Sequence, residues 1–145
     1  MVAEARDRRP ALTGAYSQPL LLDTHALLWW LTGNVKLSGR VRRAIEKDSG
    51  QIGVSAASGW EIATKARLGK LPEAMQIAHR LRELVAEQGF PLLPITFAEG
   101  ERAGWLPGPH GDPFDRMLAA HALMLDIPIA TRDRQFEIFG VDVIW

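Results

Sequence analysis

Short apolar runs alternate with longer amphipathic segments along most of the chain, and this alternation limits the possible folds more than any other feature. Five runs are typical of buried strands, at 20–22, 51–55, 92–95, 127–130 and 141–144. The segments between them carry apolar residues at helical spacing, at 25–33, 38–48, 56–68, 72–86, 97–104, 113–125 and 132–139. Strands and helices that alternate in this way predict an α/β fold with a mostly parallel central sheet.

Residues typical of helix starts indicate where several of the predicted helices begin. Thr24 is expected to cap the first helix, since a threonine oxygen accepts a free backbone N–H at a helix start. Pro72 suits the first position of a single long helix that continues to Ala86. Asp112 is expected to cap the next-to-last helix, with Pro113 at its first position.

The chain has 145 residues, the length of one domain, with 17 basic and 17 acidic residues and no cysteine. Zero net charge excludes a polycation, so any contact with nucleic acid requires a local patch. The absence of cysteine excludes disulfides and thiolate metal sites. Residues 1–18 combine mixed charges with proline and glycine, which predicts a flexible N-terminal extension before one domain over 19–145. No secretory or membrane signal is visible, and we expect a cytoplasmic protein.

Common cofactor and catalytic motifs are missing. The chain contains neither G-x-G-x-x-G nor a P-loop, and neither H-E-x-x-H nor G-x-S-x-G. The four histidines are scattered without the spacing of metal ligands.

Polar residues gather instead after the predicted strands and at helix starts. They are Asp23, Ser55, Glu61, Asp115, Thr131 and Asp133. Ligands of open parallel sheets bind beyond the carboxyl ends of the strands, so we expect the four carboxylates to converge there. Carboxylates in one pocket repel each other, and oxygen ligands select Mg²⁺ or Mn²⁺, which suits phosphoryl chemistry. As alternatives, Asp23 and Asp115 only support helix starts, and Glu61 only pairs with Lys65.

Four sequence blocks resemble PIN-domain nucleases, especially the VapC-type toxins of bacterial toxin–antitoxin pairs. They are LLLDTHALLWWL at 20–31, SAASGWEIATKARLGKL at 55–71, DPFDRMLAA at 112–120 and ATRDRQF at 130–136. The resemblance extends over about 20–145. It implies a three-layer α/β/α sandwich and Mg²⁺-dependent endoribonuclease activity. Carried over by position, it implies metal and catalytic roles for Asp23, Glu61, Asp115 and Asp133, with Thr131 as a polar neighbour.

The resulting hypothesis is a toxin that cleaves RNA phosphodiesters by metal-activated water, with a cognate antitoxin and a homodimeric state. The alternative is a PIN-like module that binds RNA or protein without cleaving. An aspartyl-phosphate phosphatase is disfavoured because position 25 is histidine, and a receiver domain because no lysine lies near the last strand.

Basic and aromatic residues near these blocks leave two interpretations open. Arg116 and Arg132 are candidates for holding the RNA backbone, or they neutralise the carboxylates. For Arg134 we favour a solvated surface position. The tryptophans at positions 29, 30 and 60 are candidates for base stacking, and their apolar surroundings favour packing.

Overall fold

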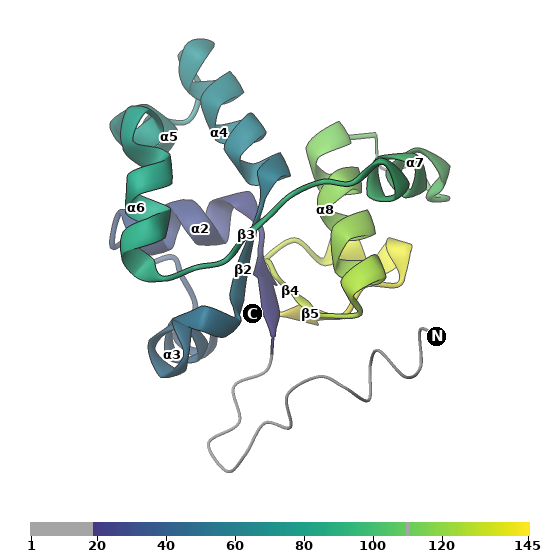
Figure 1. Ribbon diagram of the computed structural model, residues 1–145, viewed down its shortest axis with the longest axis horizontal. Coiled ribbons are helices and arrows are strands. Elements are labelled where there is room, and N and C mark those ends of the chain that lie inside the picture. Colours follow the sequence, from purple (N-terminus) through teal and green to yellow (C-terminus); the bar gives the residue numbers. More distant parts are fainter. Residues whose placement is uncertain (1–18, 110) are drawn as a thin grey trace.

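A five-stranded parallel sheet forms the centre of the computed structural model, which describes residues 19–109 and 111–145 (Figure 1). The strands are β1 (Leu20–Leu22), β2 (Ile52–Ser55), β3 (Leu92–Leu93), β4 (Ile129–Ala130) and β5 (Val143–Ile144), in the order β3-β2-β1-β4-β5. The expected N-terminal extension, residues 1–18, lies outside the described residues. Because the chain winds outward from β1 to β3 and then resumes at β4, the strand order reverses between β1 and β4, where α/β sheets bind their ligands.

Helices cover both faces of this sheet. They are α2 (Thr24–Leu31), α3 (Gly39–Lys47), α4 (Ala56–Arg67), α5 (Pro72–Ile77), α6 (Leu81–Gln88), α7 (Phe97–Trp105) and α8 (Pro113–Leu125). Short 3₁₀ helices lie at Ser49–Gln51, Ala78–Arg80 and Arg134–Phe139. Figure 1 shows α2 to α6 on one side of the strands and α7 and α8 on the other. The three-layer α/β/α arrangement with a parallel sheet is therefore confirmed.

Alternating side chains of β1 divide the apolar core into two clusters. Leu20 and Leu22 pack with residues of α2 to α6, whereas Leu21 packs with residues of α7, α8 and the last 3₁₀ helix. All three leucines are buried. A strand that is apolar on both faces belongs in the middle of a three-layer sandwich, which is why this run has no polar residue.

Two boundary predictions were wrong. Asp23, not Thr24, is the N-cap of α2, because its carboxylate accepts the Ala26 N–H at 2.7 Å while Thr24 is already helical. The predicted helix over 72–86 is divided into α5, a 3₁₀ turn and α6. The backbone bends at Ile77 and Arg80, and this bend lets both halves pack on the same apolar cluster.

The remaining elements agree with the pattern to within a few residues. Asp112 caps α8 and Pro113 occupies its first turn, as predicted. The short helix predicted over 132–139 is a 3₁₀ helix that spans Arg134–Phe139. Among the described residues, no helix is long and apolar enough to cross a membrane.

Candidate active site

A cavity of about 120 Å³ opens at the carboxyl edge of the sheet, at the reversal of strand order. Its walls are Asp23, Thr24, His25, Glu61, Lys65, Asp112, Asp115, Asp133 and Phe136. These residues come from the ends of β1 and β4, from α2 and α4, from the start of α8 and from the last 3₁₀ helix. The four acids singled out from the sequence therefore share one cavity, and a fifth, Asp112, joins them.

The strand ends hold two of the acids by local hydrogen bonds. Asp23 is 8% exposed and accepts the Ala26 N–H and a hydrogen bond from the side chain of Thr131. Thr131 Oγ1 in turn accepts the Asp133 N–H at 2.9 Å. The carboxylate of Asp133 accepts the Gln135 N–H at 2.9 Å. Thr131 thus connects the two aspartates across the β1–β4 junction, a role that fits its predicted place as a polar neighbour.

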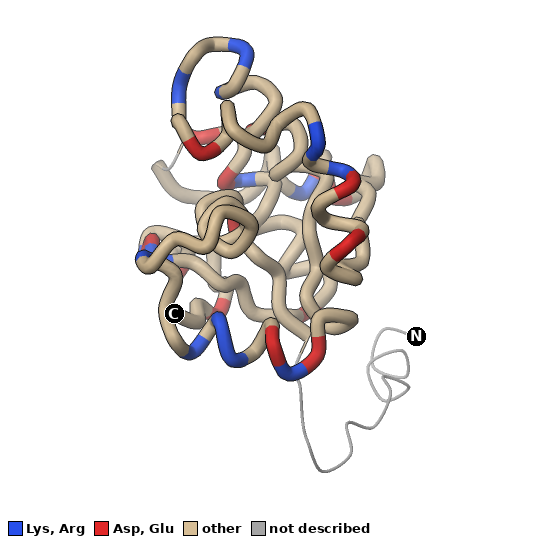
Figure 2. The backbone as a smooth tube through the Cα atoms, turned by 90° about the vertical axis from the view of Figure 1, so that its left-hand side faces the viewer, with Lys and Arg blue, Asp and Glu red and all other residues tan. Residues whose placement is uncertain are grey.

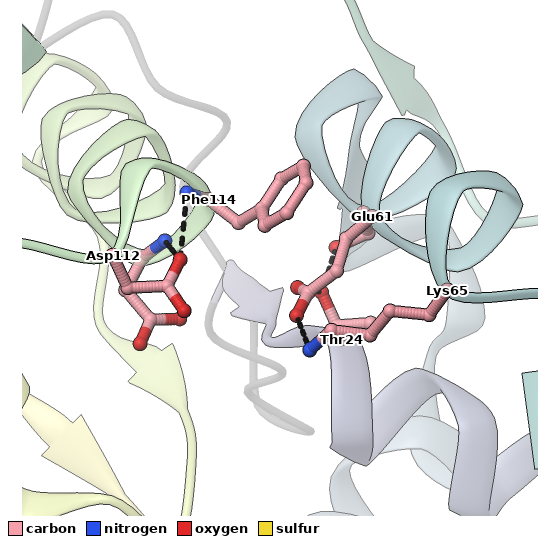
Figure 3. Close-up of polar contacts among 7 residues, drawn as sticks. Thr24, Glu61, Lys65, Asp112 and Phe114 are labelled. Atoms are coloured by element: carbon pink, nitrogen blue, oxygen red, sulfur yellow. Dashed lines mark hydrogen bonds and ion pairs between the residues drawn. The ribbon is translucent and has the colours of Figure 1, made fainter. Parts of the chain in front are cut away.

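Glu61 is buried on α4 and is held by two side chains (Figure 3). Thr24 Oγ1 donates to Glu61 Oε1 at 2.5 Å, and the Lys65 ammonium pairs with the other carboxylate oxygen. Glu61 therefore lines the cavity and also forms the i, i+4 ion pair with Lys65.

The start of α8 brings the remaining acids to the cavity. Asp112 Oδ1 accepts the N–H groups of Phe114 at 2.8 Å and Asp115 at 3.2 Å, which fixes the first turn. Phe114 points from α8 towards α4 (Figure 3), where its ring meets Trp60 edge-on with centroids 4.4 Å apart. This aromatic contact connects the two helices beside the acids. Trp60 packs there while remaining 53% exposed.

The electrostatics of the cavity favour a cation. Burial, with smaller contributions from the negative charges of Asp115 and Glu61, raises the pKa of Asp23 to about 7, although the hydrogen bonds from Thr131 and Ala26 act in the opposite direction. Burial also lowers the pKa of His25, which lines the same cavity. Bringing these carboxylates together without a counter-ion thus costs free energy, mainly by desolvating Asp23.

The donor set fits a hydrated hard cation rather than a closed protein cage. Within 19–109 and 111–145, no three His, Cys, Asp or Glu side chains stand close enough together to form a metal site as they are. Mg²⁺, however, keeps several of its waters and needs only one or two carboxylates. The carboxylate oxygens of Asp23, Asp115 and Asp133 offer such ligands, and Glu61 would have to exchange its Lys65 partner to join them.

Ser55 and Arg116, both singled out from the sequence, do not line this cavity, and neither do Thr131 and Arg132. Ser55 is the N-cap of α4, and its Oγ lies 3.1 Å from Nδ1 of the buried His121. Arg116 donates to the carbonyls of Ala103, Gly104 and Leu106 near the end of α7. Its guanidinium is therefore engaged in connecting α7 with α8, and an RNA-backbone role for Arg116 is not supported.

The structure also shows the contacts of the other basic and aromatic residues named from the sequence. Arg132 is exposed, with its guanidinium 4.8 Å from the Trp29 ring centroid. Arg134 pairs with Glu137 on the surface, in agreement with the prediction for that residue. Trp29 is buried and Trp30 donates from its ring to Gln88, so both serve packing.

Sequence analysis missed the contribution of His25 to the cavity. His25 has no other histidine at the spacing of metal ligands, so that pattern does not indicate it. Its position two residues after Asp23, in the first turn of α2, was the available signal, since the start of that helix faces the carboxyl edge of the sheet.

Comparisons with known proteins agree with this geometry. A chain in a DNA-bound VapBC complex from Salmonella typhimurium is 17% identical, with a TM-score of 0.67 over 88% of this chain and 97% of that one. FitAcB from Neisseria gonorrhoeae gives 19% identity and a TM-score of 0.61 over 87% and 96% of the two chains. A toxin–antitoxin complex from Klebsiella pneumoniae gives 19% and 0.62 over the same shares.

At these identities the solved structures establish the fold alone. A comparison with curated proteins gave no match. The PIN domain family model matches residues 20–141, which include every acid of the cavity. The chain therefore belongs to the PIN domain family.

Proposed function

We propose that this protein is a Mg²⁺-dependent endoribonuclease that acts as the toxin of a toxin–antitoxin pair. The observation that carries the proposal is the convergence of Asp23, Glu61, Asp115 and Asp133 on one cavity at the β1–β4 junction. A pocket with this excess of carboxylates attracts a divalent cation, and the phosphodiester group is a substrate that such a cation can activate.

The side chains have separable roles in this proposal. Asp23, Asp115 and Asp133 hold the cation, directly or through its waters, and Glu61 joins them when Lys65 releases it. Thr131 orients Asp23 through its hydroxyl and Asp133 through that residue's N–H. When bound, Mg²⁺ supplies a more acidic water and neutralises charge on the phosphate. Mn²⁺, which prefers the same oxygen ligands, is expected to substitute.

The proposed partners are an antitoxin and a second copy of this chain. Structures of similar fold include toxin–antitoxin complexes, which supports an antitoxin as partner. Co-expression with the product of the neighbouring reading frame should yield a stable complex on purification. The homodimer is tested separately, by the mass of the purified toxin in sedimentation equilibrium. A monomer at all concentrations would contradict it.

Cleavage is tested on labelled RNA with the purified chain. We expect cleavage in Mg²⁺ or Mn²⁺, none in EDTA, and loss of cleavage in Asp115→Asn. Glu46→Gln, an exposed charge change on α3, is the matched control and should cleave like wild type.

The alternative, a module that binds without cleaving, is favoured by one observation. Lys65 already neutralises Glu61, and a cavity satisfied by its own lysine has less need of a metal. RNA binding without cleavage in any divalent ion, together with no change in melting temperature on adding Mg²⁺, would establish the alternative over the nuclease.

A further inference from the structure

A second cavity, of about 240 Å³, adjoins the acidic one. The two cavities share Asp23, His25 and Asp133, so one extended ligand can occupy both of them. The second cavity adds Trp29 and Arg132 to its walls and contains no further carboxylate. The second cavity is therefore less acidic than the first.

Two cations lie over the buried Trp29 ring: Arg132, which lines the second cavity, and Lys36, which does not. Arg132 lies 4.8 Å and Lys36 5.9 Å from the Trp29 ring centroid, measured from the guanidinium carbon and the ammonium nitrogen. Both side chains are exposed, and neither forms an ion pair with a carboxylate of the described residues. We call Trp29, Lys36 and Arg132 the Trp29 shelf.

Two other aromatic rings contact Trp29 and hold it in place. Trp29 is 5% exposed, contacts Trp145 edge-on with centroids 5.8 Å apart, and has the His25 ring 5.5 Å away. A ring this buried offers little surface for stacking a base. It serves instead to hold the cations above it, since cation–π contacts favour a positive charge over the face of tryptophan.

Neutralising the acidic cavity does not explain this arrangement. Arg132 is adjacent to Asp133 in sequence and shares the second cavity with Asp23, yet its guanidinium lies on Trp29 and pairs with neither. Its charge nevertheless reaches the shared wall, because it contributes to lowering the pKa of His25. Arg132 is thus held beside Asp23 and Asp133 while its guanidinium remains exposed to solvent.

We propose that the Trp29 shelf binds a backbone phosphate of single-stranded RNA next to the phosphate that enters the acidic cavity. This rests on the proposed nuclease function and extends it by giving the direction in which the substrate leaves the site. A neutral protein with an acidic cavity repels RNA locally, so nearby phosphate contacts are needed to offset that repulsion. Arginine can bind phosphate through two N–H groups, and lysine adds a point charge. The shelf positions substrate and recognises no base.

The test measures RNA binding and cleavage separately in the full chain. Binding of two fluorescein-labelled single-stranded RNAs of unrelated sequence is followed by anisotropy in EDTA over a series of salt concentrations. Single-turnover cleavage in Mg²⁺ gives the half-saturating protein concentration and the maximal rate. The variants are Lys36→Gln, Arg132→Gln and Arg132→Lys, with Arg82→Gln as control, because Arg82 is exposed on α6 and lines neither cavity.

Loss of either shelf charge should weaken binding about three- to tenfold for all sequences and reduce the slope of log affinity against log salt by about 0.7. The half-saturating concentration should rise while the maximal rate is kept. Arg132→Lys should recover part of the affinity, and Arg82→Gln should match wild type. Unchanged affinity and salt slope in both Gln variants, or an altered sequence preference, would overturn the shelf.

The readouts distinguish this proposal from the one on which it rests. RNA binding that depends on the shelf without any cleavage would refute the nuclease and leave the shelf standing. Cleavage that is indifferent to both Gln variants would refute the shelf alone. Labelled poly-glutamate serves as a further probe: if the variants weaken its binding but not that of RNA, the shelf docks an acidic protein segment and the RNA proposal is wrong.

Discussion

Replacing Asp23 with asparagine should stabilise the protein in the absence of metal, although the residue lies in the proposed catalytic cavity. Burial and the neighbouring carboxylates raise the pKa of Asp23 from the ordinary value of 3.8 to about 7. Each pKa unit is worth about 1.4 kcal/mol, so ionised Asp23 opposes folding by about 4 kcal/mol above pH 7. Asparagine caps helices as well as aspartate does, and we allow about 1 kcal/mol for a weakened bond to Thr131. The net gain expected at pH 8 is therefore about 2–3 kcal/mol.

The sign of the pH dependence follows from the same shift. The folded state keeps its proton on Asp23 up to higher pH than the unfolded chain does. The wild type therefore loses stability as the pH rises from about 4 to about 7, and the loss is complete above the folded pKa. Asp23→Asn has no proton to lose there, so its advantage should be present at pH 8 and absent near pH 4.

Urea unfolding in EDTA at these two pH values measures the effect. In thermal melts the gain at pH 8 should appear as a shift of about 5–10 °C. Glu46→Gln on α3 makes the same change of net charge at an exposed position and should show no such dependence. Adding Mg²⁺ should raise the melting temperature of wild type more than that of Asp23→Asn, because a ligand of the folded state stabilises it in proportion to its affinity. If Asp23→Asn is less stable than wild type by the same amount at both pH values, the electrostatic argument is wrong.

Three further substitutions test other parts of the site. Asp115→Asn should lower RNA cleavage in Mg²⁺ at least about 100-fold while circular dichroism shows an unchanged fold, since it removes ligand charge but keeps the side-chain shape; full activity would remove Asp115 from the site. Lys65→Met should strengthen Mg²⁺ binding about two- to fivefold in calorimetric titration, because it frees Glu61 from a partly exposed pair, and weaker binding would contradict the competition. Arg116→Met should lower the free energy of unfolding by about 1–3 kcal/mol through loss of its bonds to the end of α7, with kcat/KM unchanged below the melting temperature; a specific rise in KM would instead return Arg116 to the RNA-binding surface.

The sheet and the gathering of the acids could be predicted because both depend on local pattern. An apolar run followed by a polar residue marks the carboxyl end of a strand, and parallel strands bring these ends to one edge. Asp23 and Asp133 meet for that reason, although 110 positions separate them in sequence. The start of α8 could be predicted as well, since aspartate followed by proline is typical of a helix N-terminus.

The partners of the arginines could not be predicted in the same way. Arg116 and Arg132 both lie next to an acid in sequence, and sequence proximity alone suggested one role for the two. The structure separates them because their side chains leave different elements: Arg116 projects from α8 onto α7, whereas Arg132 follows β4 and lies against Trp29. The packing of α7 on α8 and of α2 beside β4 determines where each arginine side chain lies. Neither contact produces a periodic pattern in the sequence.

Four acids of the cavity are held in place by contacts of their own, and this explains how a repulsive cluster persists before any cation binds. Asp23, Asp112 and Asp133 each accept backbone N–H groups at a helix start, where the helix dipole favours negative charge. Glu61 is held by Thr24 and Lys65 instead. Each of these four carboxylates thus has a local partner that fixes its direction, and burial is the main cause of the raised pKa of Asp23. Burying Asp23 at the end of β1 carries a free-energy cost, and that residue should therefore couple cation binding to folding stability.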